Sequence, residues 1–96
     1  MTQTSRPSRP PYEVQISRSV QKELDRQARN TRERLLKAIL ALADNPRPIG
    51  SRHIEGQEDI YRVRVGDWRI TYAIYDERLV VTVIKVGSRG DVYRGF

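Results

Sequence analysis

The stretch that decides the fold is Ile60-Tyr61-Arg62-Val63-Arg64-Val65-Gly66-Asp67-Trp68-Arg69-Ile70-Thr71-Tyr72. Apolar and polar residues alternate on both sides of Gly66-Asp67, which is the period of two half-buried β-strands. A two-residue loop with glycine first is typical of a tight hairpin turn. The turn therefore predicts a complete register: Val65 opposite Trp68, Arg64 opposite Arg69, Val63 opposite Ile70, Arg62 opposite Thr71 and Tyr61 opposite Tyr72.

This register sorts the side chains onto two faces of the sheet. One face carries Arg62, Arg64, Arg69 and Thr71, with no acidic residue on the same patch. Directly opposed like charges destabilise a strand pair by up to about 1 kcal/mol, so the pair Arg64 and Arg69 favours an anion-binding site over a merely solvated surface. The other face is apolar and should pack against helices. It holds Tyr61, Val63, Val65, Trp68, Ile70, Tyr72 and Ile74, with Leu79, Val81 and Val83 from the following strand.

The segments before the hairpin predict one strand and two helices. Residues 12–16 alternate as a strand does, and Ser17 should cap a helix whose apolar stripe is Val20, Leu24 and Ala28. Asn30 and Glu33 resemble a capping box for a second helix, which Asp44-Asn45-Pro46-Arg47-Pro48 ends. The apolar set of that second helix is Leu35, Leu36, Ile39, Leu40 and Leu42.

The remaining segments complete an α+β layout. Residues 49–58 read as an irregular polar connection, and strands are expected over 59–65, 68–75 and 79–86, with Asp76-Glu77 at the second turn. An N-terminal strand, an antiparallel helix hairpin and a three-stranded antiparallel meander should form a four-stranded sheet with helices on one face. Residues 1–11 are expected to be a flexible, basic, proline-rich tail, and residues 12–96 a single domain.

Composition excludes several classes of protein. The chain has 96 residues, a formal charge of +6 and no cysteine, and 15 of its 18 cations are arginine. The lack of cysteine excludes disulfides, thiolate zinc sites and cysteine nucleophiles, and is typical of a cytoplasmic protein. No apolar run approaches the length needed to cross a bilayer, so no membrane partner is expected. The arginine bias favours phosphate binding, because the planar guanidinium grips phosphate bidentately.

The chemistry of the remaining polar residues points away from metals and cofactors. The carboxylates of Glu58, Asp59, Asp67, Asp76 and Glu77 are spread over turns and the connection, so we expect no metal site and no cofactor. His53 is the only histidine and has no nucleophile motif around it. Arginines that bind phosphate without metal can support cleavage only where a substrate 2′-hydroxyl attacks its own phosphate, which restricts the substrate to RNA.

The carboxy-terminal half resembles the RelE/ParE superfamily of bacterial toxins, and more closely its RelE branch. The resemblance is carried by the quoted hairpin, by Val80 to Val86 and by Gly87-Ser88-Arg89-Gly90-Asp91-Val92-Tyr93. It implies a RelE-like toxin of a type II toxin–antitoxin system: a ribosome-dependent, metal-independent mRNA endonuclease. Its implied partners are a RelB-like antitoxin, the ribosome with its 16S rRNA, and mRNA in the ribosomal A site. The catalytic residues implied by position are Arg62, Arg64, Arg69, Arg89 and Tyr93.

One departure from the RelE pattern bears on mechanism. Family members with well-developed RelE activity resemble each other in having lysines at the two strand positions occupied here by Arg62 and Arg64, where one lysine can serve as general base. An arginine, with a pKa above about 12, scarcely accepts a proton at neutral pH. Arg62 and Arg64 are therefore expected to bind phosphate and polarise the 2′-hydroxyl. Two alternatives remain open at this stage: a ParE-like poison of DNA gyrase without nuclease activity, and a nucleic-acid binding module without chemistry.

Overall fold

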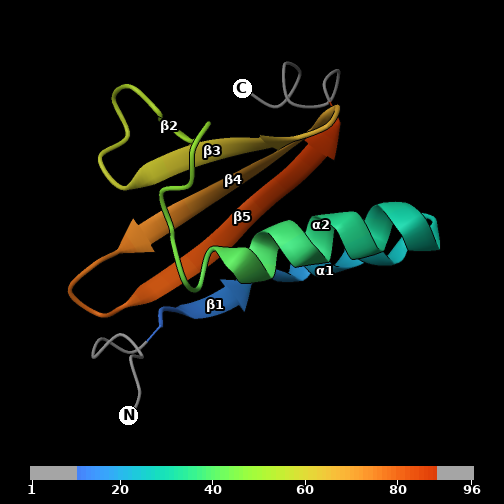
Figure 1. Cartoon of the computed structure of the whole chain (residues 1–96), viewed down its shortest axis with the longest axis horizontal. Helices are drawn as coiled ribbons and strands as arrows, with labels where there is room; N and C mark the ends of the chain where they lie inside the picture. The colour runs from blue at the N-terminus through green and yellow to red at the C-terminus, as the bar shows by residue number, and fades with distance from the viewer. Residues whose placement is uncertain (1–10, 89–96) are drawn as a thin grey trace, which may run out of the picture.

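The computed structural model describes residues 11–88, which form a sheet with both helices on one of its faces (Figure 1). The predicted α+β class is confirmed. Within this range no helix has the length and apolar character to cross a bilayer. The elements are β1 (Glu13–Ile16), α1 (Arg18–Asp25), α2 (Arg29–Ala41), β2 (Arg52–His53), β3 (Ile60–Val65), β4 (Trp68–Tyr75) and β5 (Val80–Ser88).

The hairpin of β3 and β4 has the register predicted from its turn. All five predicted pairs are present, from Val65 opposite Trp68 to Tyr61 opposite Tyr72. Gly66 has φ +61°, the left-handed region that the first position of this turn requires and that glycine enters without steric cost. The alternation of the sequence and the turn geometry therefore agree.

The sheet has five strands, so the predicted count of four is wrong. Its order is β1-β5-β4-β3-β2, with β1 parallel to β5 at one edge. The additional strand is β2, which lies in the connection expected to be irregular and pairs antiparallel with β3. Two residues are too few to show an alternating pattern, so this strand has no signature in the sequence.

Strand β5 departs from simple alternation. Tyr72 pairs with Val83 but Thr71 pairs with Lys85, so Ile84 is an extra residue at a β-bulge. The bulge moves Lys85 to the face of Thr71, and Val86 is buried in the core.

Leu79 was predicted to face the core from the last strand, and this is wrong. It lies in a four-residue turn between Tyr75 and Val80, with φ 55°, and is half-buried. The turn is longer than Asp76-Glu77 because Tyr75 pairs directly with Val80. A leucine in the left-handed region is uncommon, since its Cβ crowds the backbone there.

The helices begin differently from one another. The predicted cap of α1 is confirmed, because the Ser17 hydroxyl accepts a hydrogen bond from the Val20 amide at 3.3 Å. The predicted capping box of α2 is wrong: the helix begins at Arg29, so Asn30 lies inside it. Glu33 instead pairs with Arg29 one turn away at 3.1 Å. Ala28, predicted for the stripe of the first helix, is the exposed N-cap of α2.

The core lies between the helices and the apolar face of the sheet. Leu40, although predicted to be in it, is 60% exposed because it follows the buried Ile39 and must point away from the sheet. Tyr61, Val63, Val65 and Trp68 pack against the core from β3 and β4, as predicted. The buried apolar cluster of the core consists of Val20, Leu24, Leu35, Ile39, Leu42, Ile70, Tyr72, Ile74, Val81, Val83 and Val86.

Candidate functional site

The predicted arginines of β3 and β4 share the sheet face away from the helices. Arg64 lies directly opposite Arg69, and Arg62 lies opposite Thr71. Arg64 is exposed, whereas Arg62 and Arg69 are half-buried and atom Nη1 of Arg69 is fully buried. Partial burial strengthens the interaction of a cation with a bound anion, because less water screens the charge.

Lys85 joins these arginines, although the sequence pattern did not predict it. Strict alternation from Val81 and Val83 would put Lys85 on the core face. The bulge at Ile84 instead sets it beside Thr71, across from Arg62. The sequence does contain one signal of the bulge. Simple alternation would put the charged Lys85 on the core face and the apolar Val86 on the opposite face, which is the reverse of what each side chain prefers.

Arg52 extends the same row from the opposite edge. In β2 it pairs with Arg62, so Arg52, Arg62, Thr71 and Lys85 follow one another across four strands. Arg64 and Arg69 form the next row toward the β3–β4 turn. We call this surface the basic face, defined by Arg52, Arg62, Arg64, Arg69 and Lys85.

A pocket of about 420 Å³ opens beside the basic face. It includes Arg62 and Thr71 from the sheet, and Glu55 from the connection. The expectation that no acidic residue lies near the arginines is therefore wrong. Glu55 is seven residues from Arg62, in a segment whose path the alternation does not predict.

The remaining predicted site residues, Arg89 and Tyr93, lie outside the described residues, as does the tail up to residue 10. Their assignment to the site stays a prediction. Strand β5 ends at Ser88, beside Trp68 and one position beyond the pair of Gly87 with Arg69. The last described residue of β5 therefore lies at the end of the sheet where Arg64 and Arg69 lie.

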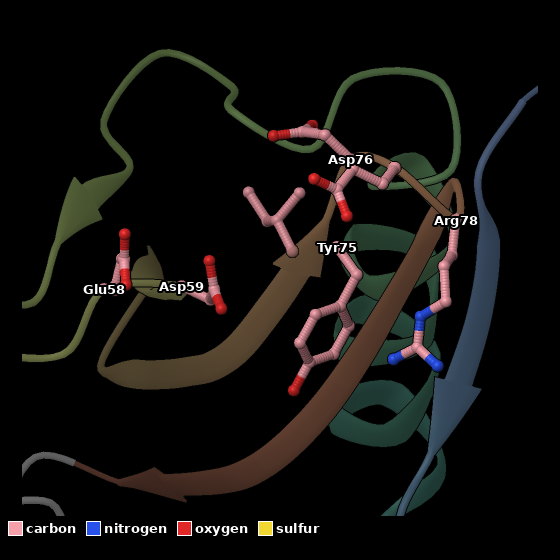
Figure 2. Close-up of a pocket in the computed structure, with 7 residues that line it drawn as sticks. Glu58, Asp59, Tyr75, Asp76 and Arg78 are labelled. Atoms are coloured by element: carbon pink, nitrogen blue, oxygen red, sulfur yellow. The ribbon is translucent and has the colours of Figure 1, made fainter.

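The opposite end of β4 is acidic. Figure 2 shows the carboxylates of Glu58, Asp59 and Asp76 around a second pocket of about 420 Å³, with Arg78 on the far side from Glu58. Glu77 also lines this pocket, so four carboxylates that were expected to stay apart share one surface. Within residues 11–88, however, no three histidine or carboxylate side chains are grouped closely enough to hold a metal ion.

Asp76 is already engaged by neighbouring side chains. Its carboxylate accepts hydrogen bonds from Arg47 at 2.8 and 3.2 Å and from the Tyr12 hydroxyl at 2.6 Å. The hydrogen bonds from Arg47, and then from Tyr12, hold the pKa of Asp76 below its usual value. Arg47 also donates to the Tyr61 hydroxyl at 3.2 Å. This network joins the residue before β1 and the segment after α2 to β3 and the β4–β5 turn, so its function is structural.

His53 is fixed by its neighbours as well. Its Nε2 lies 2.7 Å from the Glu58 carbonyl oxygen, and its ring centroid is 5.0 Å from that of Tyr61. His53 pairs with Tyr61 in the sheet, so it lies on the face opposite to Arg52 and Arg62. It therefore does not belong to the basic face.

Comparisons with known proteins agree with this geometry. A family model described as the ParE toxin of the type II toxin–antitoxin system parDE matches residues 14–93. The mRNA interferase toxin RelE of Escherichia coli K12 is 30% identical over 80 residues, which cover 81% of this chain and 83% of RelE.

Two solved structures show the same fold. The archaeal RelE–RelB complex from Pyrococcus horikoshii matches with a TM-score of 0.75 and 29% identity, over 83% of this chain and 97% of that one. The isolated Escherichia coli RelE toxin matches with a TM-score of 0.70 and 28% identity, over 88% of this chain and 93% of that one. From the family match over residues 14–93 and these shared folds, we conclude that the chain belongs to the RelE/ParE family of toxins of type II toxin–antitoxin systems.

Proposed function

We propose that this toxin is a ribosome-dependent endoribonuclease that cuts mRNA in the A site without a metal ion. The observation that carries the proposal is the basic face, above all Arg64 directly opposite Arg69. Two guanidiniums on neighbouring strands can both donate hydrogen bonds to one phosphate group placed between them. The similarity to a protein named mRNA interferase toxin RelE supports the same substrate.

The reaction can be written with the substrate, water and side chains of this chain. The 2′-hydroxyl attacks the adjacent phosphorus and its proton passes to solvent water, because no arginine can accept it at neutral pH. The bond from phosphorus to the 5′-oxygen breaks, and a 2′,3′-cyclic phosphate forms. Arg62 and Arg64 bind the phosphate and polarise the 2′-hydroxyl, and Arg69 stabilises the dianionic transition state. Arg89 adds positive charge and Tyr93 donates a proton to the leaving 5′-oxygen.

The partners follow from the same proposal. A RelB-like antitoxin neutralises the toxin, and the solved complex of the archaeal relative with RelB supports this. The ribosome, through its 16S rRNA, holds the message against the basic face. Both ribosome and message are cytoplasmic, so the toxin acts there.

A second candidate is a ParE-like poison of DNA gyrase without nuclease activity. The description of the matching family model, which names the ParE toxin, favours it. This candidate predicts inhibited supercoiling with the message left whole, whereas the first predicts cleaved message and unaffected gyrase.

The deciding experiment is cleavage of a defined message on programmed ribosomes, read by primer extension, with toxin that has been treated with EDTA and then freed of the chelator before it is added. We expect wild-type toxin to cut and Arg69→Ala to lose about 100-fold or more in rate, because a transition-state cation is removed. The matched control is Arg78→Ala: this arginine lies over the Tyr75 ring at the other end of β4 and should leave the rate unchanged.

Two results would contradict the proposal. One is a message that stays intact with wild-type toxin on translating ribosomes. The other is an Arg69→Ala variant that cuts as fast as Arg78→Ala. A parallel gyrase supercoiling assay with the same preparations then tests the second candidate directly.

A further inference from the structure

The pocket beside the basic face has walls of two kinds. Apolar contacts come from Ile54, Ile60 and Ile84, while Glu55, Gln57, Arg62 and Thr71 supply polar groups. Its volume of about 420 Å³ falls within the range of about 300–1,000 Å³ typical of small-ligand sites. The pocket can therefore admit one planar heterocycle together with water.

The loop that carries the polar rim is held in shape by its own backbone. The amide of Ile54 donates to the Ile60 carbonyl at 2.8 Å, which closes the loop at its base. The amides of Gln57 and Ile60 donate to the carbonyls of Ile54 and Gln57 at 3.1 and 3.2 Å. Gly56 turns the chain at φ +82°, a conformation that L-residues rarely adopt. Glu55 and Gln57 are therefore presented by a preformed turn.

Ile84 of β5 forms the facing wall of the pocket. It is 41% exposed, one of only three large apolar side chains so exposed among residues 11–88. Strict alternation from Val83 would place Ile84 on this side of the sheet and turn Lys85 toward the core. The bulge instead keeps Lys85 on the basic face, so a cation and an apolar surface lie on the same side.

The polar groups match the edge of a nucleobase. A carboxylate only accepts hydrogen bonds, so Glu55 fits the exocyclic amine of cytosine or adenine, or the N1 and N2 donors of guanine. The Gln57 amide can donate to the ring nitrogen or carbonyl next to that amine. Uracil presents two carbonyl oxygens flanking a single donor, so Glu55 would repel it.

We propose that this pocket receives one unstacked base of the bound RNA and favours a base with an exocyclic amine over uracil. The inference rests on the proposed function, because Arg62 belongs both to the pocket and to the phosphate-binding basic face. Single-stranded RNA is commonly recognised in this way, by an extruded base against an apolar surface with polar contacts to its edge. The three isoleucines enclose the ring, and Glu55 selects its edge.

The test compares cleavage of ribosome-bound messages that carry each of the four bases at each A-site codon position. At one position we expect wild-type toxin to prefer adenine, cytosine or guanine to uracil in kcat/KM. Glu55→Gln should reduce that preference by about fivefold to 150-fold, because glutamine can pair with uracil. Ile84→Ala should lower kcat/KM for all four bases. Glu13→Gln is the matched control, an exposed glutamate on β1 outside the pocket.

The outcomes distinguish failure of the proposed nuclease function from failure of the proposed base pocket. If wild-type toxin cuts no message, the proposed function fails. If it cuts, but ignores uracil at every position, or if Glu55→Gln keeps the wild-type preference, the base pocket is overturned while the nuclease stands. An Ile84→Ala variant that keeps the wild-type kcat/KM for every base but binds the antitoxin more weakly would also overturn it, since the pocket would then hold an antitoxin side chain.

Discussion

Tyr72 packs in the core and also holds the segment that follows α2 by a hydrogen bond. It is fully buried, and its hydroxyl donates a hydrogen bond of 2.8 Å to the Pro46 carbonyl, just after the end of α2. Burial raises the pKa of this phenol to about 12. A buried hydroxyl with a partner is stable, but the same group as a phenolate is not.

We predict that Tyr72→Phe lowers the free energy of unfolding by about 1 kcal/mol at pH 7, because the buried Pro46 carbonyl loses its donor. The raised pKa makes Tyr72 contribute stability below its unfolded value near pH 10, and this contribution is lost as the pH rises toward about 12. The variant should therefore lose less stability than wild type between pH 10 and 12. Urea unfolding at both pH values measures this.

Tyr75→Phe is the control for this alkaline effect, since Tyr75 is only half-buried. If both tyrosine variants show the same pH dependence, Tyr72 does not cause the alkaline loss. Sequence reasoning assigned Tyr72 to the core face, but could not identify Pro46 as its partner, because the two are 26 residues apart.

At the scale of elements, the β3–β4 hairpin holds the paired arginines. Its register depends on Gly66 at φ +61°. The Arg34 guanidinium of α2 lies over the turn, and a Cβ added to Gly66 would come within 2.5 Å of its Nη2 atom. The side chain of Arg34 is flexible at its end, so the backbone angle carries most of the cost of substitution.

We expect Gly66→Ala to destabilise the protein by about 1–2 kcal/mol, the cost of a Cβ in the left-handed region. Thermal unfolding followed by circular dichroism measures the loss. Gly50→Ala is the control for the added contact, since Gly50 also has positive φ but nothing lies within 4 Å of its added Cβ. A variant Gly66→Ala as stable as wild type would show that the turn relaxes to another type.

The elements also differ in how far the sequence predicts them. The sequence predicts the hairpin because its determinants, alternation and a glycine turn, are contiguous along the chain. It does not predict the bulge at Ile84 or the short strand β2, because each exists only through pairing with a neighbouring strand. These two features bring Lys85 and Arg52 to the basic face, so the site is larger than the predicted set.

Over the whole molecule, charge is divided between the two ends of the sheet. Arg69 is the second residue of β4 and Asp76 follows its last residue, so the basic and acidic ends lie roughly 20 Å apart along the strand. This separation exceeds the screening length of about 8 Å at physiological salt. The acidic end therefore does not cancel the potential at the basic face, and a polyanion should approach that face.

We predict that single-stranded RNA binds the isolated toxin with affinity that falls as salt rises. Arg52→Ala and Lys85→Ala should each reduce the slope of log K against log salt by about 0.7, the value for one phosphate contact on a single strand. Arg26→Ala should leave the slope unchanged, because Arg26 is the C-cap of α1 and the helices lie on the other face of the sheet. Fluorescence anisotropy of labelled RNA at several salt concentrations measures these slopes. Equal slopes for wild type and all variants would show that Arg52 and Lys85 do not contact the phosphates of the RNA.

The sequence by itself determined the α+β class, the hairpin register and the opposed Arg64 and Arg69, because these depend on neighbours along the chain. Tertiary structure alone decided that Arg52 and Lys85 join them, and that Glu55 lines a pocket with Arg62. The physical reason is that backbone pairing between strands selects bulges and edge strands by the energy of the whole sheet. No local pattern of residues encodes that energy.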